Sequence, residues 1–301
     1  MDSVSKKKPQ ISQLEFPIAT PLQADRNSIR GGRSFYFFDL DDNVLNLPTP
    51  LFVFNKKDGS ELSITTREFA NISHQLGTSG RWQDFEERFD PDSGSFRRFR
   101  QKKIGIVDKL LGKKQPILED LLSALKQPVD TWRGPSWNFF WHAVHNARPL
   151  SIITARGHHP DTMKLGIRQL VKQGHLSREP NYLSLFPVSH FDVRKELGDH
   201  DGSWHTAKLK QLAIQKSVRE AFRIYGFNPA HRFGMSDDDP TNVKLIVEAM
   251  QELKREFPEN SFFVIDTQGG QMHKQEVFMD HVKAPEPFGH TQLSLFESQL
   301  P

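Results

Sequence analysis

The 301-residue chain contains no cysteine, so it has neither a disulfide framework nor a thiolate metal site. It also lacks any apolar run near the roughly 20 residues that a membrane-spanning helix needs. The polar, lysine-bearing segment 1–10 is not followed by an apolar run, so it does not have the pattern of a secretory signal. These absences predict a cytoplasmic protein without a membrane partner.

A strong charge of either sign is missing too, because 40 Lys and Arg residues stand against 37 Asp and Glu, for a net charge of +3. A surplus this small does not by itself indicate nucleic-acid binding. No internal repeat of solenoid period is present. The length suits one large core with a smaller cap, or two modest domains.

The most informative segment that is present runs from Phe35 to Leu45, with the sequence FYFFDLDDNVL. Its apolar run without alternation is typical of a central parallel strand that is covered on both faces. Such sheets bind ligands at the carboxyl ends of their strands, where Asp39 and Asp41 follow. The two carboxylates are two residues apart on an extended segment and therefore face one pocket. A metal ion or a shared proton would offset their repulsion, and an acidic turn is the alternative interpretation.

Later segments repeat the pattern of a strand that ends in polar residues. One apolar run ends at Thr154, and another ends in the carboxylates 237–239. A lysine-bearing segment with helical periodicity, 205–225, lies between them. Carboxylates, hydroxyl, lysine and carboxylates therefore follow one another, mostly at strand ends.

This order resembles the haloacid dehalogenase-like (HAD) hydrolase superfamily of phosphatases, over roughly residues 34–267 apart from an insert. The first motif is close to the family pattern DxDx(T/V), with Asp42 in place of the usual glycine and Asn43 in place of the usual threonine. The resemblance implies an α/β fold: a Rossmann-like parallel sheet flanked by helices, with a β-hairpin flap and a mainly helical cap insert.

The resemblance also implies the chemistry. Asp39 would be the nucleophile that forms an aspartyl-phosphate, and Asp41 would protonate the leaving oxygen and then activate water. Thr154 would hold a phosphate oxygen. Magnesium would bridge Asp39, the backbone carbonyl of Asp41 and an aspartate of the last motif, Asp237 or Asp238. An acid at position 41 favours phosphate-ester hydrolysis over dehalogenation.

The catalytic lysine has several candidates in the segment 205–225, namely Lys208, Lys210 and Lys216. Lys210 lies near the edge of the predicted buried stripe, four residues before Ile214, whereas Lys208 points away from that stripe. We favour Lys210 and keep Lys208 as the alternative.

In the last motif, Asp237 directly follows the strand and is the first choice of metal ligand, with Asp238 as the second. Asp239 is expected to cap a helix that begins near Pro240, since proline suits a first helical turn. Asn242 stands where the family often has a second acid.

Arg156, Asn43 and Asn242 are the candidate substrate-binding residues. Arg156 is favoured for phosphate contact because guanidinium binds phosphate bidentately. His158 and His159 follow on the same loop, where substrate contact is plausible, although loop histidines are usually solvated.

The predicted organisation has a flexible N-terminal arm at 1–33, a core at 34–267 interrupted by the cap insert 67–147, and a mobile tail at 268–301. The Asp-Gly pair 58–59 separates two strand-like segments and predicts a hairpin, where the family has its flap. The insert carries a run of interleaved cations and aromatics at 96–103, which is either a nucleic-acid surface or a solvated face with core anchors.

The tail contains Gln292, Leu293, Ser294, Leu295 and Phe296. This pentapeptide resembles the motif by which bacterial DNA polymerases and repair proteins bind the sliding clamp, in which the glutamine forms hydrogen bonds and the apolar side chains fill a pocket. A terminal segment that folds back on its own core is the alternative.

Together these interpretations predict a magnesium-dependent phosphatase, tethered to the clamp, that acts on phosphorylated DNA ends such as a 3′-phosphate. The alternatives are a small-metabolite phosphatase and a non-catalytic clamp-binding adaptor on a phosphatase-like scaffold.

Overall fold

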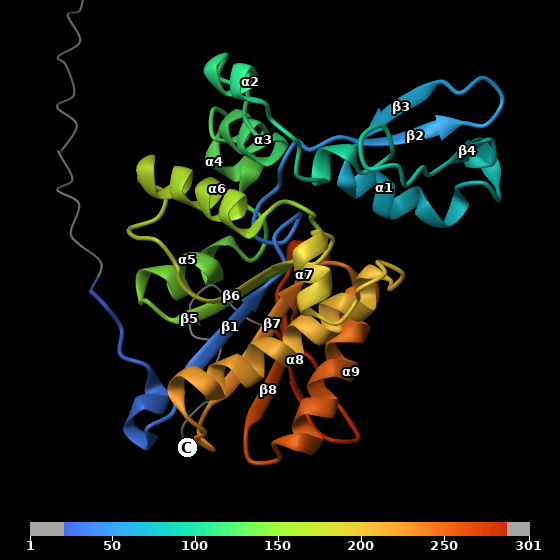
Figure 1. Cartoon of the computed structure of the whole chain (residues 1–301). Helices are drawn as coiled ribbons and strands as arrows, with labels where there is room; N and C mark the ends of the chain where they lie inside the picture. The colour runs from blue at the N-terminus through green and yellow to red at the C-terminus, as the bar shows by residue number, and fades with distance from the viewer. Residues whose placement is uncertain (1–20, 288–301) are drawn as a thin grey trace, which may run out of the picture.

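The computed structural model describes residues 21–287, shown in Figure 1. Its main sheet has seven strands in the order β10-β9-β8-β7-β1-β5-β6, in which all neighbours are parallel except β8–β9 and β9–β10. This mostly parallel sheet flanked by helices confirms the predicted α/β class and is compatible with a Rossmann-like fold. The strands are β1 (Ser34–Phe38), β5 (Pro149–Thr154), β6 (Asn181–Pro187), β7 (Arg232–Asp237), β8 (Ser261–Asp266), β9 (His273–Val277) and β10 (Glu286–Pro287).

Strand β1 lies in the middle of the sheet, and all five of its residues are buried. Phe35 and Phe37 pack on one face with residues of α8 and α9, while Tyr36 and Phe38 pack on the other with residues of α3, α5 and α6. Both faces are therefore covered, which explains why the strand is apolar without alternation.

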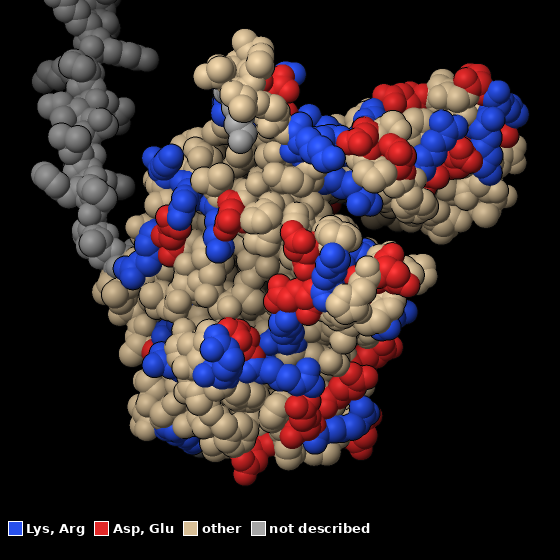
Figure 2. Space-filling view, in the orientation of Figure 1, with Lys and Arg blue, Asp and Glu red and all other residues tan. Residues whose placement is uncertain are grey.

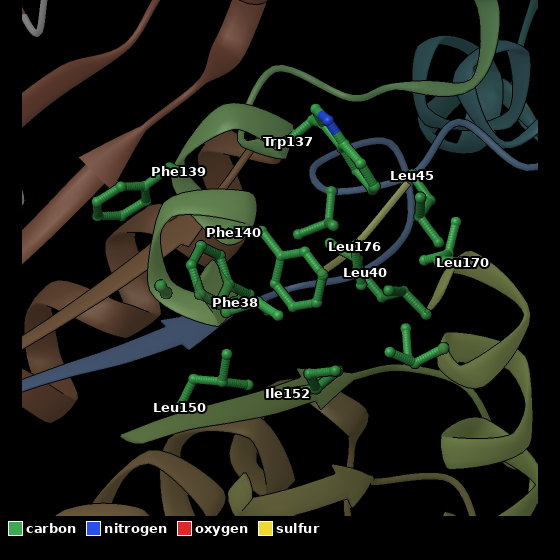
Figure 3. Close-up of a cluster of buried hydrophobic side chains, with 14 of the residues drawn as sticks. Phe38, Leu40, Leu45, Trp137, Phe139, Phe140, Leu150, Ile152, Leu170 and Leu176 are labelled. Atoms are coloured by element: carbon green, nitrogen blue, oxygen red, sulfur yellow. The ribbon is translucent and has the colours of Figure 1, made fainter. Parts of the chain in front are cut away.

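Helices cover the two faces of the sheet in layers (Figure 1). The rings of Phe139 and Phe140 each lie 5.4 Å from the ring of Phe38, between centroids (Figure 3), so α5 packs directly over β1. The helices are α1 (Thr66–Ile72), α2 (Ile106–Leu110), α3 (Pro116–Ala124), α4 (Val129–Trp132), α5 (Trp137–His145), α6 (Pro160–Lys172), α7 (Phe191–Glu196), α8 (Thr206–Tyr225) and α9 (Pro240–Glu256).

A second, three-stranded sheet of order β3-β2-β4 projects from the core together with α1 (Figure 1). Strands β2 (Leu51–Asn55) and β3 (Glu61–Ile64) form the predicted antiparallel hairpin, and β4 (Phe85–Glu86) pairs with the other edge of β2. We call residues 51–99 the lobe. It has its own small apolar core, made by Leu51, Val53, Ile64, Ile72 and Trp82.

The structural boundaries differ from the predicted ones in three places. Within the predicted arm, Arg26–Arg30 form a 3-10 helix in which Asn27 is buried and donates a hydrogen bond to Ser34. Helix α5 falls inside the range 67–147 yet packs on the main sheet. Strands β9 and β10 extend that sheet beyond residue 267.

Among the described residues, no helix is long and apolar enough to cross a bilayer.

Candidate functional site

The carboxyl ends of β1, β5 and β7 meet at one edge of the sheet, because Phe38 is in register with both Ile152 and Ser236. The backbone N–H of Asp39 donates to the carbonyl of Ser236 at 3.1 Å. Asp39 is thereby fixed next to the end of β7, where Asp237 stands. Residues that are about 200 positions apart in the sequence thus share one site.

An acid cluster forms at this edge from Asp39, Asp237 and Asp238, whose carboxylate oxygens lie within 4.8 Å of one another. The side chain of Lys210 reaches into the cluster from α8. Its Nζ donates to Asp39 Oδ1 at 2.9 Å and to Asp237 Oδ2 at 3.1 Å. Lys208 instead lies over the ring of Trp204, so Lys210 is the lysine at the site.

Asp237 is completely buried and held by hydrogen bonds on both oxygens. Oδ1 accepts from the backbone N–H of Asp239 at 3.0 Å and from Asn242 Nδ2 at 3.1 Å. Asn242 therefore orients a carboxylate of the cluster. The predicted cap is confirmed, because Asp239 accepts from the N–H of Thr241 at the start of α9.

The acid cluster carries more negative charge than Lys210 balances. Burial raises the pKa of Asp39 well above its ordinary value, and the charges of Asp237, Asp41 and Asp238 raise it further, while Lys210 opposes them. Burial and the charge of Asp237 raise the pKa of Asp238 to about 7. A bound cation would relieve this repulsion. An all-carboxylate donor set suits a hard cation that prefers oxygen ligands.

Asp41 lies outside the acid cluster and pairs with Arg156. The guanidinium donates to the Asp41 carboxylate at 2.9 Å from Nε and 2.6 Å from Nη2, and Nη2 also donates to Thr49 Oγ1 at 2.8 Å. Thr154 Oγ1 donates to Asp41 Oδ2 at 3.4 Å. Arg156 is completely buried beneath the ring of Phe99, with 4.7 Å between its Cζ and the ring centroid.

The substrate-contact prediction for Arg156 is corrected by this geometry. Two of its three nitrogens are used within the protein, and only Nη1 has no hydrogen-bond partner among the described residues. Its main contact is the carboxylate of Asp41, two residues beyond Asp39, and so it positions that side chain.

Asn43 is also placed differently from the prediction. Its carboxamide has no exposed surface. Nδ2 donates to the backbone carbonyls of Asp39 at 3.1 Å and Ser236 at 3.0 Å, while Oδ1 accepts from Ser136 Oγ and Thr267 Oγ1. Asn43 therefore joins four segments of the interior and is not available to a substrate.

Asp42 has a backbone conformation that favours glycine. Its φ is +56°, in the left-handed region that glycine adopts without steric cost. Aspartate is among the residues that tolerate this conformation best, so the loop keeps the shape.

The histidines of the following loop differ from each other. His158 is completely buried, and neither ring nitrogen has a hydrogen-bond partner among the described residues. Burial and the charge of Arg156 lower its pKa to about 2, so the ring is neutral. His159 accepts a hydrogen bond from the N–H of Asp161 and caps α6. The expectation of solvated loop histidines is therefore wrong for His158.

Three residues that support the site were not anticipated: Thr49, Ser136 and Thr267. They are hydroxyl residues without a motif around them, and their role depends on contacts with Arg156 and Asn43. The predicted partner-binding peptide 292–296 lies outside the described residues.

No family model, curated protein or solved structure matches this chain. The functional argument therefore starts from the geometry of the site.

Proposed function

We propose that the protein is a magnesium-dependent phosphatase of the HAD type that hydrolyses phosphate monoesters. The observation that carries the proposal is Lys210 bound between Asp39 and Asp237, with Asp238 beside them. Carboxylates and an ammonium group at one strand edge supply the nucleophile, the cation ligands and the positive charge that phosphoryl transfer needs.

In the proposed reaction, a carboxylate oxygen of Asp39 attacks phosphorus, and the bond from phosphorus to the leaving oxygen breaks. Asp41 gives its proton to that oxygen. Water then attacks the phosphorus of the aspartyl-phosphate and gives a proton to Asp41, which releases inorganic phosphate and restores Asp39. Lys210 and the Thr154 hydroxyl stabilise the charge on the phosphate oxygens.

The residues present fit a magnesium ion, because their donors are carboxylate oxygens, and burial and the charge of Asp237 raise the pKa of Asp238. Asp39, Asp237 or Asp238, and the backbone carbonyl of Asp41 would hold it. When bound, the ion would neutralise charge on the transferring phosphoryl group.

The hairpin β2–β3 and the segment that contains α2 to α4 are proposed as flap and cap, which would cover the site and choose the substrate. Their support is position: the hairpin follows the Asp39 loop directly, and the lobe projects beside the carboxyl edge of the sheet (Figure 1).

A generic assay tests the proposal. Wild type with magnesium should release phosphate from p-nitrophenyl phosphate, and Asp39→Asn should not. Asp239→Asn is a matched control, because the side chain of this residue caps α9 and makes no contact with the acid cluster carboxylates, while its backbone N–H is retained. Equal activity of wild type and Asp39→Asn would contradict the mechanism, and an inactive wild type would favour the clamp-binding adaptor.

The substrate and the partner are separate parts of the proposal. The peptide Gln292–Phe296 supports binding to the DNA sliding clamp, which would hold the enzyme near phosphorylated DNA ends. Deleting residues 292–301 should abolish affinity for the clamp without changing phosphate release. A panel of 3′-phosphorylated oligonucleotides, nucleotides and sugar phosphates then separates a DNA-end substrate from a small metabolite.

A further inference from the structure

The run of cations and aromatics at 96–103 is mostly paired within the protein. Arg97 binds Glu61 at 2.9 Å, Arg98 binds Asp120 at 2.5 Å, and Lys102 lies 3.7 Å from Asp92. Its two phenylalanines, Phe96 and Phe99, pack against the lobe core. For most of the run, the interpretation as a charged face with core anchors therefore holds.

Arg100 and the exposed Lys103 are the exceptions. The side chain of Arg100 is half-buried, yet its guanidinium makes no hydrogen bond, ion pair or aromatic contact with any residue from 21 to 287. Burial lowers the pKa of Arg100, and the charge of Arg194 lowers it further. A half-buried cation without a partner costs free energy that a bound anion would offset.

Arg100 is held beside the candidate site by the backbone. The N–H of Gly157 donates to the carbonyl of Phe99 at 2.8 Å, and the N–H of Gln101 donates to the carbonyl of Gly157 at 3.1 Å. Gly157 follows Arg156, which binds Asp41. The backbone on either side of Arg100 is therefore hydrogen-bonded to the loop that contains Arg156, the partner of Asp41.

Arg194 belongs to α7, which follows the carboxyl end of β6. Its Nη2 is bound to Asp199 Oδ2 and to the carbonyls of Gly202 and Trp204, so its charge is paired within the protein. Figure 2 shows Lys and Arg atoms gathered where the lobe joins the body, above a notch.

We propose that Arg100 binds a second phosphate group of the substrate, separate from the phosphate that is hydrolysed. A guanidinium with free donors matches phosphate oxygens bidentately. The inference rests on the proposed phosphatase function and narrows it to substrates with two phosphate groups. The second phosphate is either a phosphodiester of a nucleic-acid strand or a further phosphate of a small metabolite.

The test compares Arg100→Met, which keeps the apolar stem, with the control Arg223→Met. Arg223 is exposed at the end of α8 and pairs with Glu220. Three substrates are used: p-nitrophenyl phosphate, a nucleoside 3′,5′-bisphosphate and a 3′-phosphorylated single-stranded oligonucleotide. We expect Arg100→Met to lower kcat/KM about 10- to 100-fold where a second phosphate is present, and to leave p-nitrophenyl phosphate unaffected.

The substrates identify the source of the phosphate. A lower kcat/KM of Arg100→Met for both the oligonucleotide and the bisphosphate supports a site for any second phosphate. A lower kcat/KM for the oligonucleotide alone supports a site for a nucleic-acid strand. If the second phosphate belongs to a nucleic-acid strand, Arg100→Met should also reduce the slope of log affinity against log salt concentration by about 0.7. Equal loss on p-nitrophenyl phosphate would overturn the proposal, because Arg100 would then only support the loop at Gly157.

A failure of the phosphatase proposal is distinguishable from a failure of this one. If wild type hydrolyses none of the substrates, the anisotropy of a labelled 3′-phosphorylated oligonucleotide still reports binding. Weaker binding by Arg100→Met than by wild type and Arg223→Met supports the anion site. Equal binding by all three contradicts it.

Discussion

Asp39 of the acid cluster and Asp41 of the Asp41–Arg156 pair lie on one loop, but the cluster and the pair have opposite electrostatic character. In the cluster, three carboxylates share one ammonium group, and the pKa of Asp238 rises to about 7. In the pair, one carboxylate meets one guanidinium, and burial together with the charge of Arg156 lowers the pKa of the neighbouring His158 to about 2.

This difference indicates that the acid cluster at Asp39, and not the Asp41–Arg156 pair, is suited to binding a cation. The cluster has surplus negative charge in a buried position, where a divalent ion would stabilise the folded state. The pair is already balanced, because both oxygens of the Asp41 carboxylate accept hydrogen bonds from Arg156 or Thr154. Two aspartates at i and i+2 thus have different electrostatic surroundings.

The largest expected effect is the loss of phosphatase activity on substitution of Asp39, which is compared with substitution of Asp41. Asp39→Asn should lower kcat by at least about 10³-fold, because it removes the nucleophile. Asp41→Asn should also be slow, but it should still accumulate phosphate on Asp39 when the leaving group needs no proton, since only the base for the second step is lost. Mass spectrometry of the acid-quenched protein measures the adduct. An adduct in Asp39→Asn would contradict the assignment.

Breaking the balanced pair should cost stability. Arg156→Met leaves the partly buried Asp41 carboxylate without its partner and should lower the free energy of unfolding by about 3 kcal/mol. Arg168→Met is the control, because its exposed pair with Glu179 contributes about 1 kcal/mol or less. Urea denaturation measures both. Equal losses would mean that Arg156 does not stabilise Asp41.

Magnesium should stabilise the cluster side selectively. At 100 times its dissociation constant, the ion should raise the free energy of unfolding of wild type by about 2.7 kcal/mol. Asp237→Asn should lose this increment, and Asp41→Asn should keep it because the backbone carbonyl remains. Thermal unfolding with magnesium and with a chelator gives the comparison. Retention of the increment in Asp237→Asn would place the ion elsewhere.

The two sides should also respond oppositely to pH in the absence of metal. The raised pKa of Asp238 makes its contribution to stability fall as pH rises from about 4 to 7, since the unfolded state gives up this proton there while the folded state still holds it. The lowered pKa of His158 makes its contribution fall as pH drops below 6.5, because only the unfolded state binds the proton.

Each of these two groups should change the free energy of unfolding by about 1.4 kcal/mol per pH unit within its own pH range. Asp238→Asn should flatten the first slope and His158→Gln the second, in denaturant titrations from pH 4.5 to 7.5 with chelator. The exposed His205→Gln is the control. Parallel pH profiles for all variants would show that the two environments do not differ.

The helix and strand positions that frame the site could be predicted because they depend on local patterns. The apolar run before Asp39, the hairpin with its Asp-Gly turn and the cap at Asp239 each became the expected element. Helical periodicity also selected Lys210 over Lys208, since the burial of a helix face follows from spacing.

Side-chain partners could not be predicted in the same way. Arg156 was expected to face a phosphate, and Asn43 to contact a substrate, from residue type and loop position alone. Their actual partners are 115 and up to 224 residues away in the sequence. Nothing local distinguishes a guanidinium that reaches solvent from one that reaches Asp41.

By itself, the sequence determined a parallel α/β sheet with acids, a hydroxyl and a lysine beside its carboxyl edge, because strand and helix periodicity are properties of neighbouring residues. Only the tertiary structure decided that Asp39 joins an acid cluster, that Asp41 pairs with Arg156, and that Arg100 finds no partner among residues 21–287. Those outcomes depend on which distant segments pack together, since burial and charge act through space.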